Sequence, residues 1–392
     1  MYTPFPPPHT RRDTDSLKWR LFDGDVLPLW VADMDFAAPE PVLEALRARI
    51  GQGVLGYTDL AGAPETGAAS LREAIVARLW ARYGWRVEPG DIVFIPGVVT
   101  GLNLACHALG GPGDEALVQV PVYTPFLHAP ATAGMARAEV LLAPDAGGRW
   151  GFDPAAFKAA LGDRTRAFLL CNPHNPVGRA WSREELGAMA EACLERGVAM
   201  VSDEIHCDLL FGGRRHVPLA SLDPEVARRT ITLMAPSKTF NVAGLTCSFA
   251  VIQDPGLRQA YLRARKGLVP WVNLLGIVAA EAAYRHGQPW LDTVMAELEA
   301  NRRTLAEAMG GLLPGLRMDP PEATYLAWID CREAGLGGDP ARFFLEEARV
   351  ALIGGETFGT GGEGHVRLNF GCPSALLREA LDRMGAALRG RP

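Results

Sequence analysis

The sequence predicts an α/β protein built on a mainly parallel β-sheet with helices on both faces. Its 392 residues are enough for two or three domains and a large core. Between about residues 65 and 265, helix-like and strand-like segments alternate along the chain. Four strand-like runs, near Ala167, Val198, Ile231 and Cys247, are continuously apolar rather than alternating. Such runs indicate strands that are covered on both faces of their sheet.

The individual elements follow from local patterns. The first fifty residues are rich in turns and prolines, so we expect an arm that lies against the rest of the protein. The next predicted elements are helices at residues 68–83 and 101–109 and strands at residues 92–95 and 116–120. Ser182 begins a further helix, because Glu185 three positions later completes a capping box.

The last third of the chain predicts a second, smaller α/β unit. Residues 276–303 form a long helical region that is expected to bridge two domains. Beyond Leu312, the predicted strands are 325–329 and 366–369, and the predicted helices are 340–348 and 375–388. We therefore expect an N-terminal arm with the start of the small domain over residues 1–50, a large domain over 51–290 and a small domain over 291–392.

Composition restricts the possible functions. A net charge of −6 argues against a general nucleic-acid binder, which needs a basic face. No apolar stretch reaches membrane-spanning length, and the first residues do not read as a signal peptide, so we expect a cytoplasmic protein. The 7 cysteines are widely spread and lack a C-x-x-C pair. They indicate reduced thiols, and neither a disulfide framework nor a metal site is expected.

Polar residues follow three of the apolar runs. Asn175 comes after the run at 168–170, Asp203 and His206 come after the run at 198–201, and Lys238 comes after the run at 231–234. A lysine beside a buried strand becomes a useful nucleophile when burial lowers its pKa. This order of Asn, Asp with His, and Lys is the order that a site for pyridoxal 5′-phosphate (PLP) requires.

For each of these residues there are two interpretations, a contact with the cofactor or an ordinary structural role. Asp203 can keep the pyridine nitrogen of PLP protonated, or it can close a turn. Asn175 and His206 can hydrogen-bond the phenolic oxygen of the ring; the alternatives are an Asn-Pro turn and a core histidine. The glycine-flanked segment 97–101, with Val98 and Val99, suits the cofactor phosphate at a helix start, and Ser237 adds a hydroxyl.

The chain resembles the fold-type I PLP enzymes, aminotransferase class I/II, and more narrowly the MalY/PatB subgroup of cystathionine β-lyase-like C–S lyases. The segments that carry the resemblance are residues 27–36, 172–179, 203–209, 237–245, 322–328 and 366–373. The resemblance implies the PLP-dependent transferase fold, with a large domain around a mainly parallel sheet of the seven-stranded type and a smaller α/β C-terminal domain.

The resemblance also implies roles for single residues. Lys238 holds the cofactor as a Schiff base and acts in catalysis with Asp203 and Tyr57. Tyr123 stacks on the pyridine ring, and Arg367 binds the substrate α-carboxylate together with Asn175 and Tyr123. Tyr57 reaches the cofactor of a neighbouring subunit, so a homodimer with shared active sites is expected.

The chain departs from the aminotransferase pattern at two places. The first favours the lyase subgroup, and the second leaves open how the charge of the cofactor phosphate is balanced. His206 stands where aminotransferases usually carry tyrosine, and the segment 242–246 lacks their phosphate-binding arginine. The predicted function is a carbon–sulfur β-lyase that cleaves cystathionine or other cysteine S-conjugates to a thiol, pyruvate and ammonia. The alternative is a class I/II aminotransferase that uses the same residues. A purely regulatory role without catalysis is disfavoured, because Lys238 and Asp203 are both present.

Overall fold

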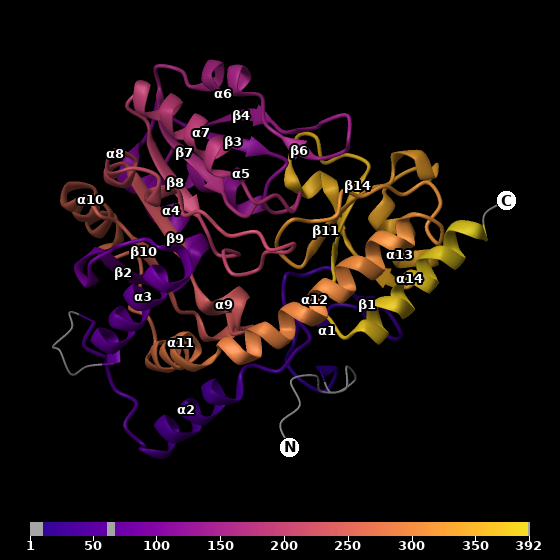
Figure 1. Ribbon diagram of the computed structural model, residues 1–392, viewed down its shortest axis with the longest axis horizontal. Helices are drawn as coiled ribbons and strands as arrows, with labels where there is room; N and C mark the ends of the chain where they lie inside the picture. The colour runs from indigo at the N-terminus through magenta and orange to yellow at the C-terminus, as the bar shows by residue number, and fades with distance from the viewer. Residues whose placement is uncertain (1–10, 61–66, 391–392) are drawn as a thin grey trace.

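A seven-stranded sheet forms the middle layer of the larger part of the protein (Figure 1). The computed structural model describes residues 11–60 and 67–390. The strand order is β2-β10-β9-β8-β7-β3-β4, and all neighbours are parallel except β10, which is antiparallel to β9 and β2. The strands are β2 (Ile92–Ile95), β3 (Glu115–Val120), β4 (Ala136–Leu141), β7 (Thr165–Cys171), β8 (Ala199–Asp203), β9 (Thr230–Met234) and β10 (Ser248–Val251). The predicted mainly parallel sheet is confirmed.

Helices on both faces explain why the strands are continuously apolar. Leu169 and Val201 face one side, in a hydrophobic cluster with α4 (Val98–Leu109) and α5 (Thr124–Thr132). Phe168 and Met200 face the other side, in a cluster with α6 (Pro154–Ala160) and α7 (Arg183–Glu195). Since successive side chains of a strand point to opposite faces, every position of these strands has to be apolar.

The observed starts of two helices, α7 and α4, can be compared with the starts that the sequence predicts. The capping box is present: Ser182 Oγ accepts a hydrogen bond from the amide of Glu185 at 3.2 Å, and the Glu185 carboxylate accepts one from the amide of Ser182 at 2.8 Å. Helix α4 begins at Val98, three residues before its predicted start, with Gly97 at the N-cap. This earlier start places the first turn of α4 at the edge of the sheet.

The predicted helical region 276–303 consists of two helices, α11 (Leu274–His286) and α12 (Gln288–Met309). Gly287 separates them, and a Cβ at this position would meet the Ala283 carbonyl oxygen at 2.5 Å and the Phe240 ring at 2.6 Å. Pro289 follows in the first turn of α12, where its missing N–H is tolerated. Helix α12 then runs from α11 towards α13 (Pro340–Glu347) and α14 (Ser374–Arg389) (Figure 1).

A smaller sheet and the N-terminal arm form the second part of the fold. Strands β11 (Leu326–Asp330), β14 (His365–Asn369) and β13 (Ile353–Gly354) make an antiparallel sheet. The arm carries α1 (Leu17–Arg20), β1 (Leu27–Pro28) and α2 (Glu40–Gly51), and β1 pairs in parallel with β12 (Val350–Ala351). The described part of the arm, residues 11–50, therefore packs through β1 against the C-terminal part of the chain, as its composition predicts, and residues 1–10 of the predicted arm lie outside the described residues.

The remaining elements include the short helix α9, which carries Lys238. They are α3 (Gly67–Tyr83), the hairpin β5 (Ala143–Pro144) and β6 (Trp150–Gly151), α8 (Pro224–Arg228), α9 (Pro236–Thr239), α10 (Pro255–Arg265) and, among the described residues, five short 3-10 helices. All seven cysteines are free and buried, in agreement with their predicted state as reduced thiols. Among the described residues, no helix is both long and apolar enough to cross a membrane.

Candidate active site

Eight of the predicted site residues line one cavity of about 240 Å³ at the carboxyl ends of β7, β8 and β9. They are Val98, Val99, Tyr123, Asn175, Asp203, His206, Ser237 and Lys238. Arg367 lies at the edge of this group, where its guanidinium donates a hydrogen bond to Asn175. Tyr57 is the exception, because it lies outside this cavity. The topology of the sheet thus brings together residues that are far apart in the sequence.

Lys238 lies in α9, one turn beyond the end of β9. Its Nζ donates a hydrogen bond of 2.6 Å to the carbonyl oxygen of Ala32. Burial lowers the pKa of Lys238 to about 8, while the nearby Asp33 carboxylate acts in the opposite direction. A larger share of this amine is neutral near pH 7 than for a solvated lysine, which suits a nucleophile or a general base.

Asp203 is the last residue of β8 and is only 6% exposed. Its Oδ1 accepts a hydrogen bond of 3.1 Å from the amide of Ile205. Burial raises the pKa of Asp203 to about 7, against the lowering effect of that backbone donor. A carboxylate in such a place is stabilised by a cationic group that faces it, which a protonated pyridine nitrogen provides.

His206 and Tyr123 add a neutral imidazole and an aromatic ring to the cavity. Burial, followed by the charges of Lys238 and Arg367, lowers the pKa of His206 to about 3, so the ring is neutral. Its Nδ1 is buried without a hydrogen-bond partner among the described residues. The backbone N–H of Tyr123 donates a hydrogen bond to the backbone carbonyl of Asn175 at 2.9 Å. This bond holds the two residues next to each other.

Arg367 is buried on β14, with 2% of its surface exposed. Its Nη1 donates to Asn175 Oδ1 at 3.1 Å, and its Nη2 donates to the carbonyl oxygen of Trp30 at 2.9 Å. The guanidinium carbon lies 5.0 Å from the centre of the Phe358 ring. Burial lowers the pKa of Arg367 to about 10, and the guanidinium remains charged at neutral pH. This is a planar, preorientated group for a carboxylate.

The start of α4 forms an anion-binding edge of the cavity. Gly97, Val98 and Val99 line the cavity at the helix N-terminus, with Ser237 nearby. Free backbone N–H groups and the helix dipole favour a phosphate at such a position. Among the described lining residues there is no arginine. The residue at the end of segment 242–246 is Thr246, which lines the cavity with a left-handed φ of +45°, an unusual conformation for a β-branched residue.

Sequence reasoning did not assign a function to residues 30–33, which we call the strap. Carbonyl oxygens of the strap accept hydrogen bonds from the two cationic groups of the site, Arg367 at Trp30 and Lys238 at Ala32. Tyr325 also donates to the Ala32 carbonyl, at 3.1 Å. The only sequence signal for this contact was that residues 27–36 carry part of the family resemblance.

A second missed feature lies behind Lys238. Thr239 donates its hydroxyl to Asp208 Oδ2 at 3.1 Å. The same carboxylate accepts a hydrogen bond from Tyr83 at 2.7 Å and pairs with Arg78 at 2.8 Å. These contacts tie the short helix α9 to α3, so Asp208 positions the segment that carries Lys238.

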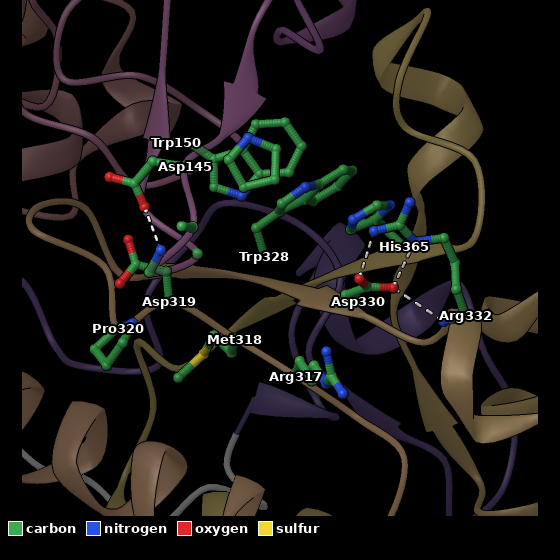
Figure 2. Close-up of a pocket in the computed structure, with 14 residues that line it drawn as sticks. Asp145, Trp150, Arg317, Met318, Asp319, Pro320, Trp328, Asp330, Arg332 and His365 are labelled. Atoms are coloured by element: carbon green, nitrogen blue, oxygen red, sulfur yellow. Dashed lines mark hydrogen bonds and ion pairs between the residues drawn. The ribbon is translucent and has the colours of Figure 1, made fainter.

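A separate cavity of about 470 Å³ lies between the β5–β6 hairpin and strands β11 and β14 (Figure 2). Trp328 and His365 stack on its wall, with ring centres 5.0 Å apart. None of the predicted site residues lines this cavity. Trp328 also packs on Phe358, the ring beneath Arg367. Trp328, a wall residue of the second cavity, is therefore linked through the Phe358 ring to the arginine of the candidate active site.

Tyr57 is fully exposed, with a relative exposure of 104%. It lines a different hollow, of about 940 Å³, formed by residues 55–58 and 270–274. Within one subunit it therefore does not contribute to the cavity that contains Lys238.

Comparison with known proteins agrees with this arrangement. The family described as aminotransferase class I and II matches residues 24–384. Cystathionine beta-lyase PatB of Bacillus subtilis (strain 168) is 42% identical over 390 residues, which cover 96% of this chain and 98% of PatB. The crystal structure of OvoB shares 44% identity and a TM-score of 0.91, over 97% of this chain and 98% of OvoB.

Cystalysin from Treponema denticola, whose crystal structure contains a PLP cofactor, shares 32% identity and a TM-score of 0.93, over 99% of both chains. These similarities extend over nearly the whole chain and confirm the resemblance that the sequence segments carry. The protein therefore belongs to the aminotransferase class I and II family.

Proposed function

We propose that this protein is a PLP-dependent carbon–sulfur β-lyase that cleaves cystathionine or related cysteine S-conjugates to a thiol, pyruvate and ammonia. The observation that carries the proposal is the cavity that joins Lys238 and Asp203, with Arg367 at its edge. Its described lining residues include no arginine for the side-chain carboxylate of aspartate or glutamate. The full-length similarity to a cystathionine β-lyase supports the same activity.

The side chains present fit PLP. The buried carboxylate of Asp203 suits the protonated pyridine nitrogen, and Tyr123 offers a ring for stacking. His206, whose buried Nδ1 has no partner in the part of the chain that the structure describes, and Asn175 supply polar groups for the phenolic oxygen. The start of α4 with Ser237 suits the phosphate. When bound, PLP supplies an electron sink for the electron pair released at the substrate Cα.

The protein's own residues then have distinct tasks. Arg367, oriented by Asn175, holds the α-carboxylate and so fixes the direction of the Cα–H bond. The neutral amine of Lys238 removes the Cα proton as a general base. Loss of the β-substituent as a thiolate follows, because a thiolate is a good leaving group. Asp208 keeps Lys238 in place through Thr239.

We also propose a homodimer in which Tyr57 serves the cofactor of the other subunit. Tyr57 is fully exposed, and it lines one hollow together with Leu55 and Trp271, each more than half exposed. A patch of exposed large apolar side chains marks a protein–protein interface. A tyrosine hydroxyl from the partner would supply the phosphate donor that a missing arginine leaves open.

The chain organisation belongs to the same proposal. We place the N-terminal arm at residues 1–50, the large PLP-binding domain at 51–290 and the small domain at 291–392. The seven-stranded sheet within 92–251 and the antiparallel sheet within 326–369 support this division. The cytoplasmic location is also part of the proposal, and the seven free cysteines support it.

The alternative is an aminotransferase that uses the same residues, and one assay separates the two. The purified protein with PLP is given L,L-cystathionine without a keto acid, and pyruvate release is measured. It is then given aspartate with 2-oxoglutarate, and glutamate formation is measured. We expect the first reaction to be faster. If glutamate forms faster than pyruvate, the protein is an aminotransferase and the lyase proposal is wrong.

A further inference from the structure

The carboxylate of Glu322 joins the two parts of the fold. Glu322 precedes β11 of the small sheet and is 6% exposed. Its Oε2 accepts hydrogen bonds from Arg179 Nε at 3.0 Å and from the backbone N–H of Ala180 at 3.1 Å. Its Oε1 accepts hydrogen bonds from Arg149 at 2.9 Å and from Arg214 at 3.4 Å. These partners belong to the β5–β6 hairpin and to the loops after β7 and β8, so one carboxylate gathers three segments outside the small sheet.

The backbone at this contact is held as closely as the side chain. The N–H of Glu322 donates a hydrogen bond of 2.9 Å to the carbonyl oxygen of Gly178. Gly178 has a φ of +72°, and a Cβ at this position would meet the Cβ of Pro321 at 2.6 Å. Only glycine permits so close an approach in this conformation. Residues 178–180 and 321–324 together are called the junction below.

The ion pair in the junction is buried. Arg179 has 1% of its surface exposed. Burial acts to raise the pKa of Glu322, but the neighbouring arginines, Arg179 most strongly, lower it below its usual value, so the carboxylate is charged at neutral pH. The other side of the Arg179 guanidinium pairs with Glu185 at 2.8 Å. Separating a buried ion pair is unfavourable, because each charge loses its compensation. The pair therefore keeps the two segments of the junction at one distance.

The junction connects the two residues that form the α-carboxylate site. Arg179 follows Asn175 in the same loop. Glu322 leads into β11, and β11 pairs with β14 so that Trp328 lies opposite Arg367. Arg367 and Asn175 then meet at 3.1 Å. These contacts form a closed ring, in which the Glu322–Arg179 pair fixes the distance between the strand that carries Arg367 and the loop that carries Asn175.

We propose that Glu322 is a positioning residue for the α-carboxylate of the substrate and acts through Arg367. Glu322 does not line the cavity that contains Lys238, so it affects the substrate through the place of the guanidinium. A displacement of a binding group by about 1 Å weakens a site strongly. The inference rests on the role of Arg367 in the proposed function and is independent of whether the reaction is elimination or amino transfer.

The test compares two amines that differ only in the carboxylate, L-methionine and 3-(methylthio)propylamine. L-Methionine has no leaving group on its β-carbon, so it binds without β-elimination. Titration of the cofactor absorbance of the PLP-loaded protein gives both dissociation constants, and the ratio of the amine value to the amino-acid value measures the carboxylate preference. Arg367→Gln should lower this ratio about a hundredfold. Glu322→Gln should lower it about tenfold, with the binding of the amine unchanged.

A double variant shows whether Glu322 acts through Arg367. Glu322→Gln combined with Arg367→Gln should lose no more of the carboxylate preference than Arg367→Gln alone, since the guanidinium is the only route for the effect. Additive losses would refute the inference. An unchanged ratio in Glu322→Gln would also refute it, while Arg367 keeps its role. An unchanged ratio in Arg367→Gln would instead overturn the role of Arg367 in the proposed function, and the inference with it.

Asp91→Asn is the matched control for a loss of stability. Asp91 pairs with Arg258 at 3.0 Å, and the two side chains are 13% and 19% exposed. This ion pair lies within the larger part of the fold and does not touch the junction, so the variant should keep the wild-type ratio. Thermal unfolding of both variants shows that the proteins compared are folded.

A second set of substitutions decides if Glu322→Gln does not fold. Arg149 and Arg214 are exposed at 46% and 48% of their side chains, and both contact Oε1 of Glu322. Replacing both by methionine should lower the carboxylate preference about threefold, as the loss of partly exposed ion pairs produces. An unchanged ratio in this double variant would refute the inference in the same way.

Discussion

Arg367 Nη1 lies 3.1 Å from Asn175 Oδ1, although the two residues are 192 positions apart in the chain. The contact joins β14 of the small sheet to the loop that follows β7 of the large sheet. It leaves the Nε of Arg367 buried without a partner among the described residues. The guanidinium is therefore held in one orientation while part of its hydrogen-bonding capacity remains unused, as a carboxylate site requires.

Replacing Arg367 by glutamine should weaken every amino-acid substrate. The charge-assisted bonds to the α-carboxylate are lost, so we expect kcat/KM to fall about a hundredfold, mainly through KM. Asn175→Ala should give a smaller loss of the same kind, because it removes the orienting partner only. Steady-state kinetics with cystathionine check both variants. An unchanged KM in Arg367→Gln would assign the carboxylate to another group.

Lys238→Ala should abolish turnover and change the absorbance of the bound cofactor. The amine is the base that removes the Cα proton, and general-base catalysis contributes about 10²- to 10⁴-fold, before the loss of the covalent link to the cofactor is counted. Visible absorbance spectra and pyruvate release measure the two effects. Borohydride reduction followed by peptide mapping identifies the modified lysine. Label on a different lysine would contradict the assignment of Lys238.

Asp203 should make the stability of the cofactor-free protein depend on pH. Its pKa is about 7 in the folded protein, whereas an unfolded aspartate titrates near 4. Between these values the folded state binds more protons than the unfolded state, so the free energy of unfolding falls as pH rises from about 4 to about 7. Asp203→Asn removes this dependence.

Thermal unfolding at two pH values tests this sign. Without PLP, the Tm of Asp203→Asn relative to wild type should be higher at pH 8 than at pH 5, by about a few degrees. With PLP, turnover of the variant should fall by about a thousandfold, because the carboxylate that faces the pyridine nitrogen is lost. Near wild-type turnover would show that Asp203 only closes a turn.

Mixing two defective variants tests the shared active site. A heterodimer of Lys238→Ala and Tyr57→Phe subunits contains one site with both residues intact. If subunits exchange freely, an equal mixture should recover about a quarter of wild-type activity, because half of the dimers are mixed and each has one good site. Light scattering gives the oligomeric state of the samples. A fully active monomer, or no recovery after confirmed exchange, would refute the shared site.

The main elements of the large sheet could be predicted because their signals are local. Continuous apolar runs identified β7, β8 and β9, and the Ser182–Glu185 pattern identified the start of α7. The break at Gly287 was not predicted, since part of the requirement for glycine comes from the approach of the Phe240 ring, almost fifty residues away. Helical periodicity on both sides of the break gave no sign of it.

The sequence by itself determined which residue types end the parallel strands, and hence that Asn175, Asp203 and Lys238 meet at one edge of the sheet. It could do so because parallel strands of one sheet have their carboxyl ends together. Only the tertiary structure decided that the strap closes this edge, with Ala32 at Lys238 and Trp30 at Arg367. Those contacts depend on the pairing of β1 with β12 and on the buried Lys18–Asp35 ion pair. Both are packing events between distant segments, which no local pattern of side chains encodes.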